Sequence, residues 1–395
     1  MAETLVFALR HIPLPATSGA PIRSLRLLTG LAREFDCVMV CPGFGAGQDV
    51  VAPEEIEAAL PGVEVVAVPH RLRSRRARQV RSLAGAASAE FGGNATSALR
   101  TAVREEASRR GAEVVHYDDV SAGLCGPVPG VLNAFAPHNV EHRILADTAR
   151  HSRGPRGAFA LYDGIRLRRE ELRLWRSMDL CVAVSDLDAA AMRAGGARAL
   201  VIAPNGTDGV PRQPTPTLPA GRPLRMLFVG AGDYQPNRAG LRWLIDEILP
   251  RLDDRDWTLD VVGTPPGVLP AHPRVTFHGR VASVAPYYAA AHLAVVPIPY
   301  GSGTRLKVVE AMARGIPVVA TPVGAEGLGL RAGEHFLCGA DTAAFADALV
   351  QAAARLEGAG PSLEPLLAAA RAVAERLFWP RIAAALAADY RAASG

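Results

Sequence analysis

The chain of 395 residues is 49% hydrophobic, which is enough apolar material for two ordinary cores and therefore predicts two domains. Its formal net charge of +4 is too small to indicate a nucleic-acid partner. The five cysteines are odd in number and lack metal-site spacing, and no apolar run reaches the roughly 18 residues of a membrane span. We therefore expect a soluble cytoplasmic protein, with a peripheral position at the inner face of the membrane left open.

Strand-like apolar runs alternate with helical patterns through the first half of the chain. The predicted strands are 4–9, 37–41, 63–68, 113–117, 131–135, 180–184 and 199–203, and the clearest helices are 20–34, 95–110, 158–177 and 186–195. Such alternation is typical of a parallel sheet with helices on both faces. Residues 1–205 are therefore predicted to form one Rossmann-like domain.

Two loops of this domain follow predicted strands and are candidates for ligand binding. Gly19 ends the first loop, which either faces a phosphate group or simply turns the chain. The second loop, 137–143, contains His138, which is suited to bind a sugar hydroxyl or transfer a proton, and Arg143, which is suited to hold an anion. A capped helix start with ordinary surface side chains is the alternative for this second loop.

The most basic stretch of the chain is 71–81, which holds six arginines in eleven residues. It is interpreted either as a solvated surface or as a contact with an anionic lipid surface or anionic acceptor. Asp186 and Asp188, like Asp254 and Asp256, match an Asp-x-Asp metal pattern. Helix capping and surface charge explain both pairs better, so no metal site is predicted.

Six prolines between 204 and 223 interrupt the pattern and predict a linker at 206–223. The alternation then resumes over 224–379, which predicts a second Rossmann-like domain. Its predicted strands are 225–230, 258–262, 275–278, 293–297, 317–320 and 335–338, and its helices include 238–249, 304–314 and 363–377, with 378–393 as a terminal helix. Because ligands bind beyond the carboxyl ends of parallel strands, two such domains would face each other across a ligand-binding cleft.

The second domain contains the chain's single lysine, Lys307, among 43 basic side chains. Chance survival is one explanation, but a lysine ammonium is a compact charge that arginine does not imitate. The glycine loop at 299–303 and the helix start after it provide free N–H groups and a positive dipole end beside Arg305 and Lys307. With Glu310 one turn further on, suited to bind ribose hydroxyls, the segment predicts a nucleoside diphosphate site.

These motifs resemble those of the retaining GT-B sugar-nucleotide glycosyltransferases of glycosyltransferase family 4. The resemblance depends on five segments: His138-Asn-Val-Glu-His-Arg143, Asp179-Leu-Cys-Val-Ala-Val-Ser-Asp186, Pro204-Asn-Gly206, Phe228-Val-Gly-Ala-Gly-Asp-Tyr-Gln-Pro-Asn237 and Gly301-Ser-Gly-Thr-Arg-Leu-Lys-Val-Val-Glu-Ala-Met-Ala-Arg-Gly-Ile-Pro-Val-Val-Ala320. It implies an α/β fold of two Rossmann-like domains, with the terminal helix 380–395 packed back on the N-terminal one.

The resemblance also implies roles for individual residues. Glu310 matches the second glutamate of the family's Glu-x7-Glu motif, whereas the first falls at Ser302, a departure that bears on the donor sugar. The family's usual Arg and Lys after the first strand of the second domain are not recognisable here, so Arg305 and Lys307 are expected to hold the diphosphate. The catalytic set is then His138, Lys307 and Arg305. The implied donor-binding residues are Gly19, Gly230, Asn237, Ser302, Gly303, Thr304, Leu306 and Glu310, and the acceptor-binding residues are Asn139, Glu141 and Arg143.

The predicted activity is transfer of a sugar from a nucleoside diphosphate sugar, UDP-linked by default, with retention of configuration and without metal or cofactor. The acceptor is left open among a lipid-linked saccharide, a secondary metabolite and a small polyol. Two alternatives remain: a sugar phosphorylase or epimerase on the same fold, and a non-catalytic subunit that binds a nucleotide sugar.

Overall fold

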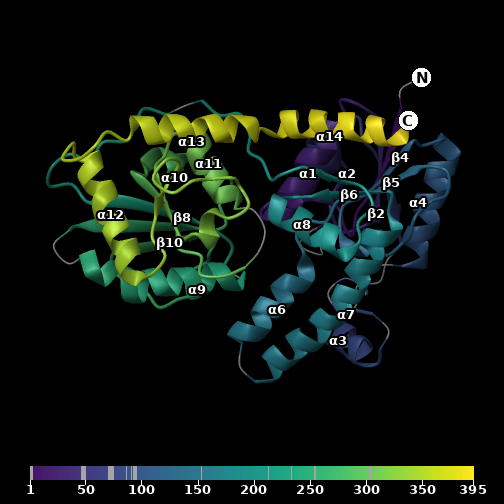
Figure 1. The fold of residues 1–395 in the computed structure, drawn as a ribbon, viewed down its shortest axis with the longest axis horizontal. Coiled ribbons are helices and arrows are strands. Elements are labelled where there is room, and N and C mark those ends of the chain that lie inside the picture. The colour runs from purple at the N-terminus through teal and green to yellow at the C-terminus, as the bar shows by residue number, and fades with distance from the viewer. Residues whose placement is uncertain are drawn as a thin grey trace. The chain divides into compact units, whose positions relative to one another are not determined.

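The computed structural model describes residues 3–45, 50–69, 75–85, 87–89, 91, 96–152, 154–211, 213–232, 234–252, 255–301 and 305–395. The chain divides into two compact units. Unit 1 consists of Met1–Pro204 with Trp379–Gly395, and unit 2 consists of Asn205–Phe378 (Figure 1).

Unit 1 is built on a parallel sheet of seven strands among its described residues. The strand order is β3-β2-β1-β4-β5-β6-β7, and the predicted strands of this half are confirmed. Their bounds are β1 Thr4–Ala8, β2 Asp36–Pro42, β3 Glu64–Val68, β4 Val114–Tyr117, β5 Leu132–Phe135, β6 Leu180–Ala183 and β7 Leu200–Ile202. The order reverses at β1 and β4, which is where a doubly wound sheet binds its ligands.

The helices of unit 1 include several that bury apolar side chains in the core of this sheet. They are α1 Gly19–Leu31, α2 Pro53–Ala59, α3 Arg75–Leu83, α4 Ser97–Arg110, α5 Val120–Gly123, α6 Glu141–His151, α7 Pro155–Ser177, α8 Asp186–Gly195 and α14 Trp379–Ser394. The terminal helix α14 contacts α1 closely, because a Cβ atom at Gly30 would lie only 2.3 Å from the Cβ of Ala383.

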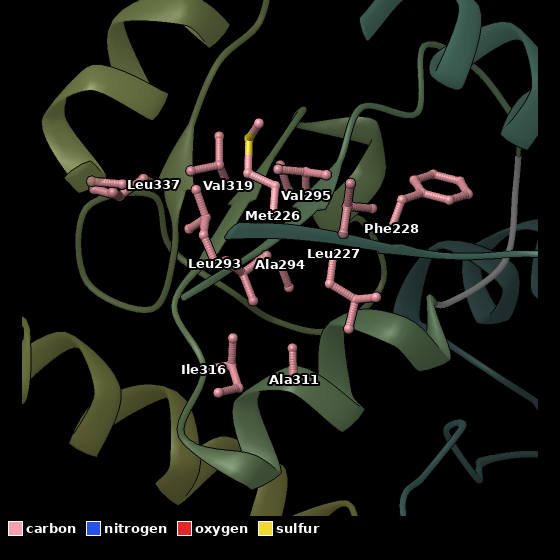
Figure 2. Close-up of a cluster of buried hydrophobic side chains, with 14 of the residues drawn as sticks. Met226, Leu227, Phe228, Leu293, Ala294, Val295, Ala311, Ile316, Val319 and Leu337 are labelled. Atoms are coloured by element: carbon pink, nitrogen blue, oxygen red, sulfur yellow. The ribbon is translucent and has the colours of Figure 1, made fainter. Parts of the chain in front are cut away.

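Unit 2 contains a second parallel sheet, with six strands among its described residues in the order β10-β9-β8-β11-β12-β13. Their bounds are β8 Leu224–Val229, β9 Trp257–Val262, β10 Val275–Gly279, β11 Leu293–Val296, β12 Val318–Ala320 and β13 Leu337–Cys338. Figure 2 shows Leu227 and Ala294 on the side of this sheet that faces Ala311 and Ile316. The strands are apolar on both faces because helices cover both.

The helices of unit 2 are α9 Gln235–Trp243, α10 Ala285–Ala290, α11 Leu306–Arg314, α12 Thr342–Leu356 and α13 Glu364–Arg376. The prediction of one helix over 238–249 is wrong in detail, because α9 gives way to a π-turn at Leu244–Ile248 and a 3-10 turn at Leu249–Leu252. Pro250 has no N–H to continue the α-helical ladder. The helix predicted over 304–314 begins at Leu306, which is half-buried.

The proline-rich segment predicted as a linker is part of unit 2 and packs against the rest of it. Its Gln213 N–H donates to Arg314 O at 3.1 Å, and its Leu218 N–H donates to Leu356 O at 2.9 Å. Leu218 is buried in the core of the unit. The prolines prevent regular structure here, but they leave enough N–H groups and apolar side chains to fix the segment.

In the described part of the chain, no helix combines the length and the apolar character needed to cross a bilayer.

Candidate active site

The loop after β8 is the first part of the candidate site in unit 2. Its Gly230 donates its N–H to Val262 O at 2.8 Å, and its carbonyl accepts from Thr264 Oγ1 at 2.8 Å. A Cβ atom at Gly230 would lie 2.7 Å from Asn237 Nδ2 and 2.8 Å from Lys307 Nζ. Three of the predicted donor-site residues therefore meet at the carboxyl end of β8, and a side chain larger than glycine at 230 would displace the ends of Asn237 and Lys307.

Lys307 projects from α11 toward this loop. Its Nζ donates to Asn237 Oδ1 at 2.8 Å and lies 4.2 Å from the centroid of the Phe228 ring. Asn237 is held in turn by a bond from its Nδ2 to Ala231 O at 2.9 Å. Burial, assisted by the nearby charge of Arg305, lowers the pKa of Lys307 to about 7. The ammonium is thus poorly compensated, and an anion bound beside it would favour its charged form.

Arg305 lies directly before α11 and is 8% exposed. Its Nη2 lies 3.3 Å from the position that a Cβ atom would take at Gly301, whose φ of +115° favours glycine. The guanidinium therefore lies against Gly301. Three predicted donor-site residues, Ser302, Gly303 and Thr304, fall outside the described residues.

Glu310 lies one turn into α11, where it accepts a hydrogen bond from Tyr288 Oη at 3.3 Å. Burial raises the pKa of Glu310, and the charge of Arg314, which stacks over the Tyr288 ring, opposes this rise. A buried carboxyl group of this kind gains from hydroxyl donors that replace lost water. Leu306, also predicted at the donor site, is the first residue of α11 and is half-buried.

In unit 1, His138 follows β5 and binds a buried carboxylate. Its Nε2 lies 2.9 Å from Asp118 Oδ2, which also accepts from Ser24 Oγ at 2.5 Å. His116 Nε2 lies 3.4 Å from the other oxygen, Asp118 Oδ1. Burial alone would raise the pKa of Asp118, but His138 and His116 hold it well below its usual range. The histidine predicted from sequence is therefore paired with an ionised partner.

The predicted acceptor residues Asn139, Glu141 and Arg143 lie at the start of α6. Asn139 Nδ2 donates to Glu141 Oε1 at 3.2 Å, while the backbone N–H of Glu141 donates to the buried Glu171 Oε1 at 2.9 Å. The capped helix start considered as an alternative is thus present, although Glu171 and not a local residue provides the cap. Arg143 is exposed, so its side chain is accessible to a ligand.

Gly19 is the exposed first residue of α1, and Ser18 before it makes no side-chain capping bond. The helix start therefore presents backbone N–H groups, as a phosphate-facing loop would. Arg23 on the same helix has a structural role, because its buried Nη2 donates to Ala203 O at 2.8 Å and its Nη1 to Pro204 O at 3.0 Å.

Asp186 and Asp188 lie in the first turn of α8, and Asp188 Oδ2 accepts from the cap residue Ser185 at 2.7 Å. This agrees with the interpretation of the pair as a helix cap. Among the residues that the structure describes, no group of three or more His, Cys, Asp or Glu side chains is placed to hold a metal ion.

Sequence reasoning missed Asp118, Ser24, His116 and Tyr390, all of which contribute to the surroundings of His138. Asp118 directly follows the apolar strand β4, at the carboxyl edge where polar residues are candidates for a site. That position was a usable signal. Tyr390 offered none, because it lies in the last helix of the chain.

The fold of the chain, and the sequence of part of unit 2, are similar to those of known proteins. The chain has the GT-B fold, an α/β architecture of two Rossmann-like sheets. The solved structures similar to it include sucrose-phosphate synthase from Thermosynechococcus elongatus, with 18% identity, a TM-score of 0.72 and coverage of 99% of this chain and 98% of that one. Anabaena HepE in complex with UDP and glucose gives 17% identity, a TM-score of 0.65 and coverage of 99% and 100%. WaaG, a glycosyltransferase involved in lipopolysaccharide biosynthesis, gives 15% identity, a TM-score of 0.62, and coverage of 98% of this chain and 99% of that one.

At the level of sequence, residues 223–355 match the family of glycosyl transferases group 1. This segment runs from the strand β8 into α12 and contains Gly230, Asn237, Lys307 and Glu310. The resemblance inferred from the motifs is therefore confirmed at the level of this family. No curated protein matches the chain.

Proposed function

We propose that the protein transfers a sugar from a nucleoside diphosphate sugar, with UDP as the nucleotide, to a hydroxyl group of an acceptor. The observation that carries this proposal is the convergence of Gly230, Asn237 and Lys307 within the segment that matches the group 1 family. The similar structures of HepE hold UDP with glucose, or UDP-glucose, which supports a uridine nucleotide for this chain as well.

Arg305, Lys307 and the start of α11 are proposed to stabilise the nucleoside diphosphate as it leaves the sugar. As the anomeric C–O bond breaks, negative charge grows on the β-phosphate oxygen. Two cations and the N–H groups of a helix start stabilise that charge, and they do so most effectively where water is excluded. We propose that these groups replace a metal ion in this role. Glu310 accepts hydrogen bonds from the ribose hydroxyls.

We also propose that the anomeric configuration is retained, because the family that the motifs resemble retains it. We further propose that Ser302, which stands in place of the family's first glutamate, changes the choice of donor sugar. The experiment therefore varies both the donor sugar and the acceptor.

The test is an assay of purified protein with a panel of UDP-sugars and of lipid-linked, glycoside and polyol acceptors, in EDTA. We expect UDP release that depends on the acceptor, with a product of unchanged anomeric configuration by NMR. Dependence on inorganic phosphate would support a phosphorylase instead, and conversion of donor without acceptor would support an epimerase. Donor binding with no turnover on any acceptor would support a non-catalytic subunit.

We also propose that α3 contacts an anionic lipid surface. Of the predicted basic stretch, residues 71–74 lie outside the described part of the chain, but α3 itself carries no acidic residue. Val80 and Leu83 on this helix are 64% and 61% exposed, beside the exposed Arg76 and Arg81. Apolar side chains among arginines match the chemistry of an anionic bilayer surface.

Sedimentation with phosphatidylglycerol-containing vesicles tests this contact. We expect the double substitution Val80→Asp with Leu83→Asp to lower vesicle binding several-fold, since each change opposes both the apolar and the electrostatic attraction. Val350→Asp, at a site 44% exposed on α12, is the matched control. Equal binding by all three proteins would contradict the proposal.

A further inference from the structure

The pairing of His138 with Asp118 belongs to a longer buried network in unit 1. Tyr390 Oη on α14 lies 2.6 Å from His116 Nδ1, and His116 Nε2 faces Asp118 Oδ1 at 3.4 Å. Phe7 stacks on the His116 ring with 4.1 Å between centroids and 16° between planes, which fixes the ring's orientation. The network thus joins the last helix of the chain to His138 through two side chains.

The chemistry of each member fixes where the protons lie. Asp118 is fully buried, and its pKa is held well below the usual range, so the carboxylate accepts hydrogen bonds and donates none. Burial raises the pKa of Tyr390 well above its ordinary value and lowers that of His116, so the phenol keeps its proton and the His116 ring is neutral. His116 must then carry its proton on Nε2, toward Asp118, and accept from Tyr390 on Nδ1.

The same reasoning applies to His138. Its Nε2 lies 2.9 Å from a carboxylate oxygen, so this nitrogen must be the protonated one. In the neutral ring Nδ1 then has a lone pair and no proton. The side chain remains 10% exposed, so it is not sealed from a ligand. Other charged or titratable groups around the network are Arg23 on α1 and His11 after β1.

We propose that Asp118 is a positioning residue, which holds His138 as the Nε2–H tautomer so that Nδ1 accepts a hydrogen bond from a sugar hydroxyl. The proposal rests on the proposed function. It makes His138 an acceptor of a hydrogen bond from the sugar and not a donor to it. His116 and Tyr390 extend the same support, because they fix the second oxygen of the carboxylate. The chain thereby selects for a substrate that offers a hydroxyl proton at this point.

The proposal is tested by two-bond ¹H–¹⁵N spectra of protein labelled in its ten histidines, with His138→Gln used to assign the resonance. We expect wild-type His138 to show the Nε2–H tautomer without any substrate. Asp118→Asn offers one acceptor and one donor where the carboxylate offered two acceptors, so the tautomer preference should weaken. We expect kcat to fall roughly tenfold or more with a smaller change in KM, since the ring is displaced and not removed.

Asp163→Asn is the matched control, because Asp163 is also a buried carboxylate of unit 1. It accepts from Ser82 Oγ at 2.6 Å and from the Ala89 N–H at 2.9 Å. This change should leave the tautomer of His138 intact even if it lowers stability. Tyr390→Phe should keep the tautomer and alter the pH profile of kcat only slightly.

Two spectroscopic results would overturn the proposal: an Nδ1–H tautomer of His138 in the wild type, or an Asp118→Asn variant in which the tautomer of His138 is unchanged. Neither spectrum requires turnover, so failure of the proposed function remains a separate result. In that case the wild-type protein would consume no nucleotide sugar, whatever the tautomer of His138.

Discussion

The two units treat charge at their candidate sites in opposite ways. In unit 2, Arg305 and Lys307 lie beside Gly301 and Gly230, and burial together with the charge of Arg305 lowers the pKa of Lys307. In unit 1, the charge of Asp118 is compensated by three donors, from His138, Ser24 and His116. The first arrangement suits a site completed by an anionic ligand. The second suits a site that is fixed before any ligand arrives.

The largest expected effect comes from removing the charge in unit 2. Lys307→Met keeps most of the side chain's volume but removes the donor to Asn237 and the charge beside the diphosphate. We expect turnover to fall by roughly a hundredfold or more, which is typical for loss of one donor to a developing negative charge. Steady-state assays with saturating donor measure this, with circular dichroism to show that the variant is folded.

Arg255→Met is the control for that experiment, because Arg255 is also a cation of unit 2 but pairs with the partly exposed Glu357. Its turnover should match the wild type. Near-normal transfer by Lys307→Met would remove the lysine from the site and with it the contrast between the two units.

A smaller effect is expected for Glu310→Gln. The amide retains an oxygen for Tyr288 but loses the charge that strengthens hydrogen bonds from ribose hydroxyls. We expect the Kd for UDP to rise about tenfold, in line with the loss of one charge-assisted bond. Isothermal titration calorimetry measures this, and Glu357→Gln should leave the Kd unchanged. Equal affinity of all three proteins would argue against the ribose assignment.

The last effect concerns stability and not binding or turnover: the free energy of unfolding should depend on pH in the absence of ligand. The pKa of Lys307 is about 7 in the folded protein, below its ordinary value of 10.5, so the unfolded chain binds more protons between these values. The contribution of this group to the free energy of unfolding should therefore rise with pH from about 7 to about 10. Urea unfolding of wild type and Lys307→Met measures this effect. Plotted against pH over this range, the free energies of unfolding of the two proteins should diverge.

That divergence should shrink when UDP is present, because the bound diphosphate restores the pKa of the lysine. Parallel curves without ligand would mean that the ammonium is compensated after all. The two units would then differ less than their contacts suggest.

The sequence was most informative where a signal is local. Apolar runs such as Leu293–Val296 predicted the strands, and the glycine loop with the helix of Lys307 after it predicted the resemblance to the glycosyl transferases group 1. The meeting of Lys307 with Asn237 could not be derived from spacing, because seventy positions separate them. Strand order brings them together, since β8 and β11 are neighbours in the sheet although two strands lie between them in sequence. Asp118 and His138 meet for the same reason, across β4 and β5.

The packing of α14 on α1 has a consequence for the order in which the protein is made. All of unit 2 precedes Trp379 in the chain, so the ribosome completes unit 2 before it supplies Ala383 for the seam at Gly30, or Tyr390 for the bond to His116. Unit 1 therefore starts first but is finished last, and its histidine network assembles only after translation has passed through unit 2.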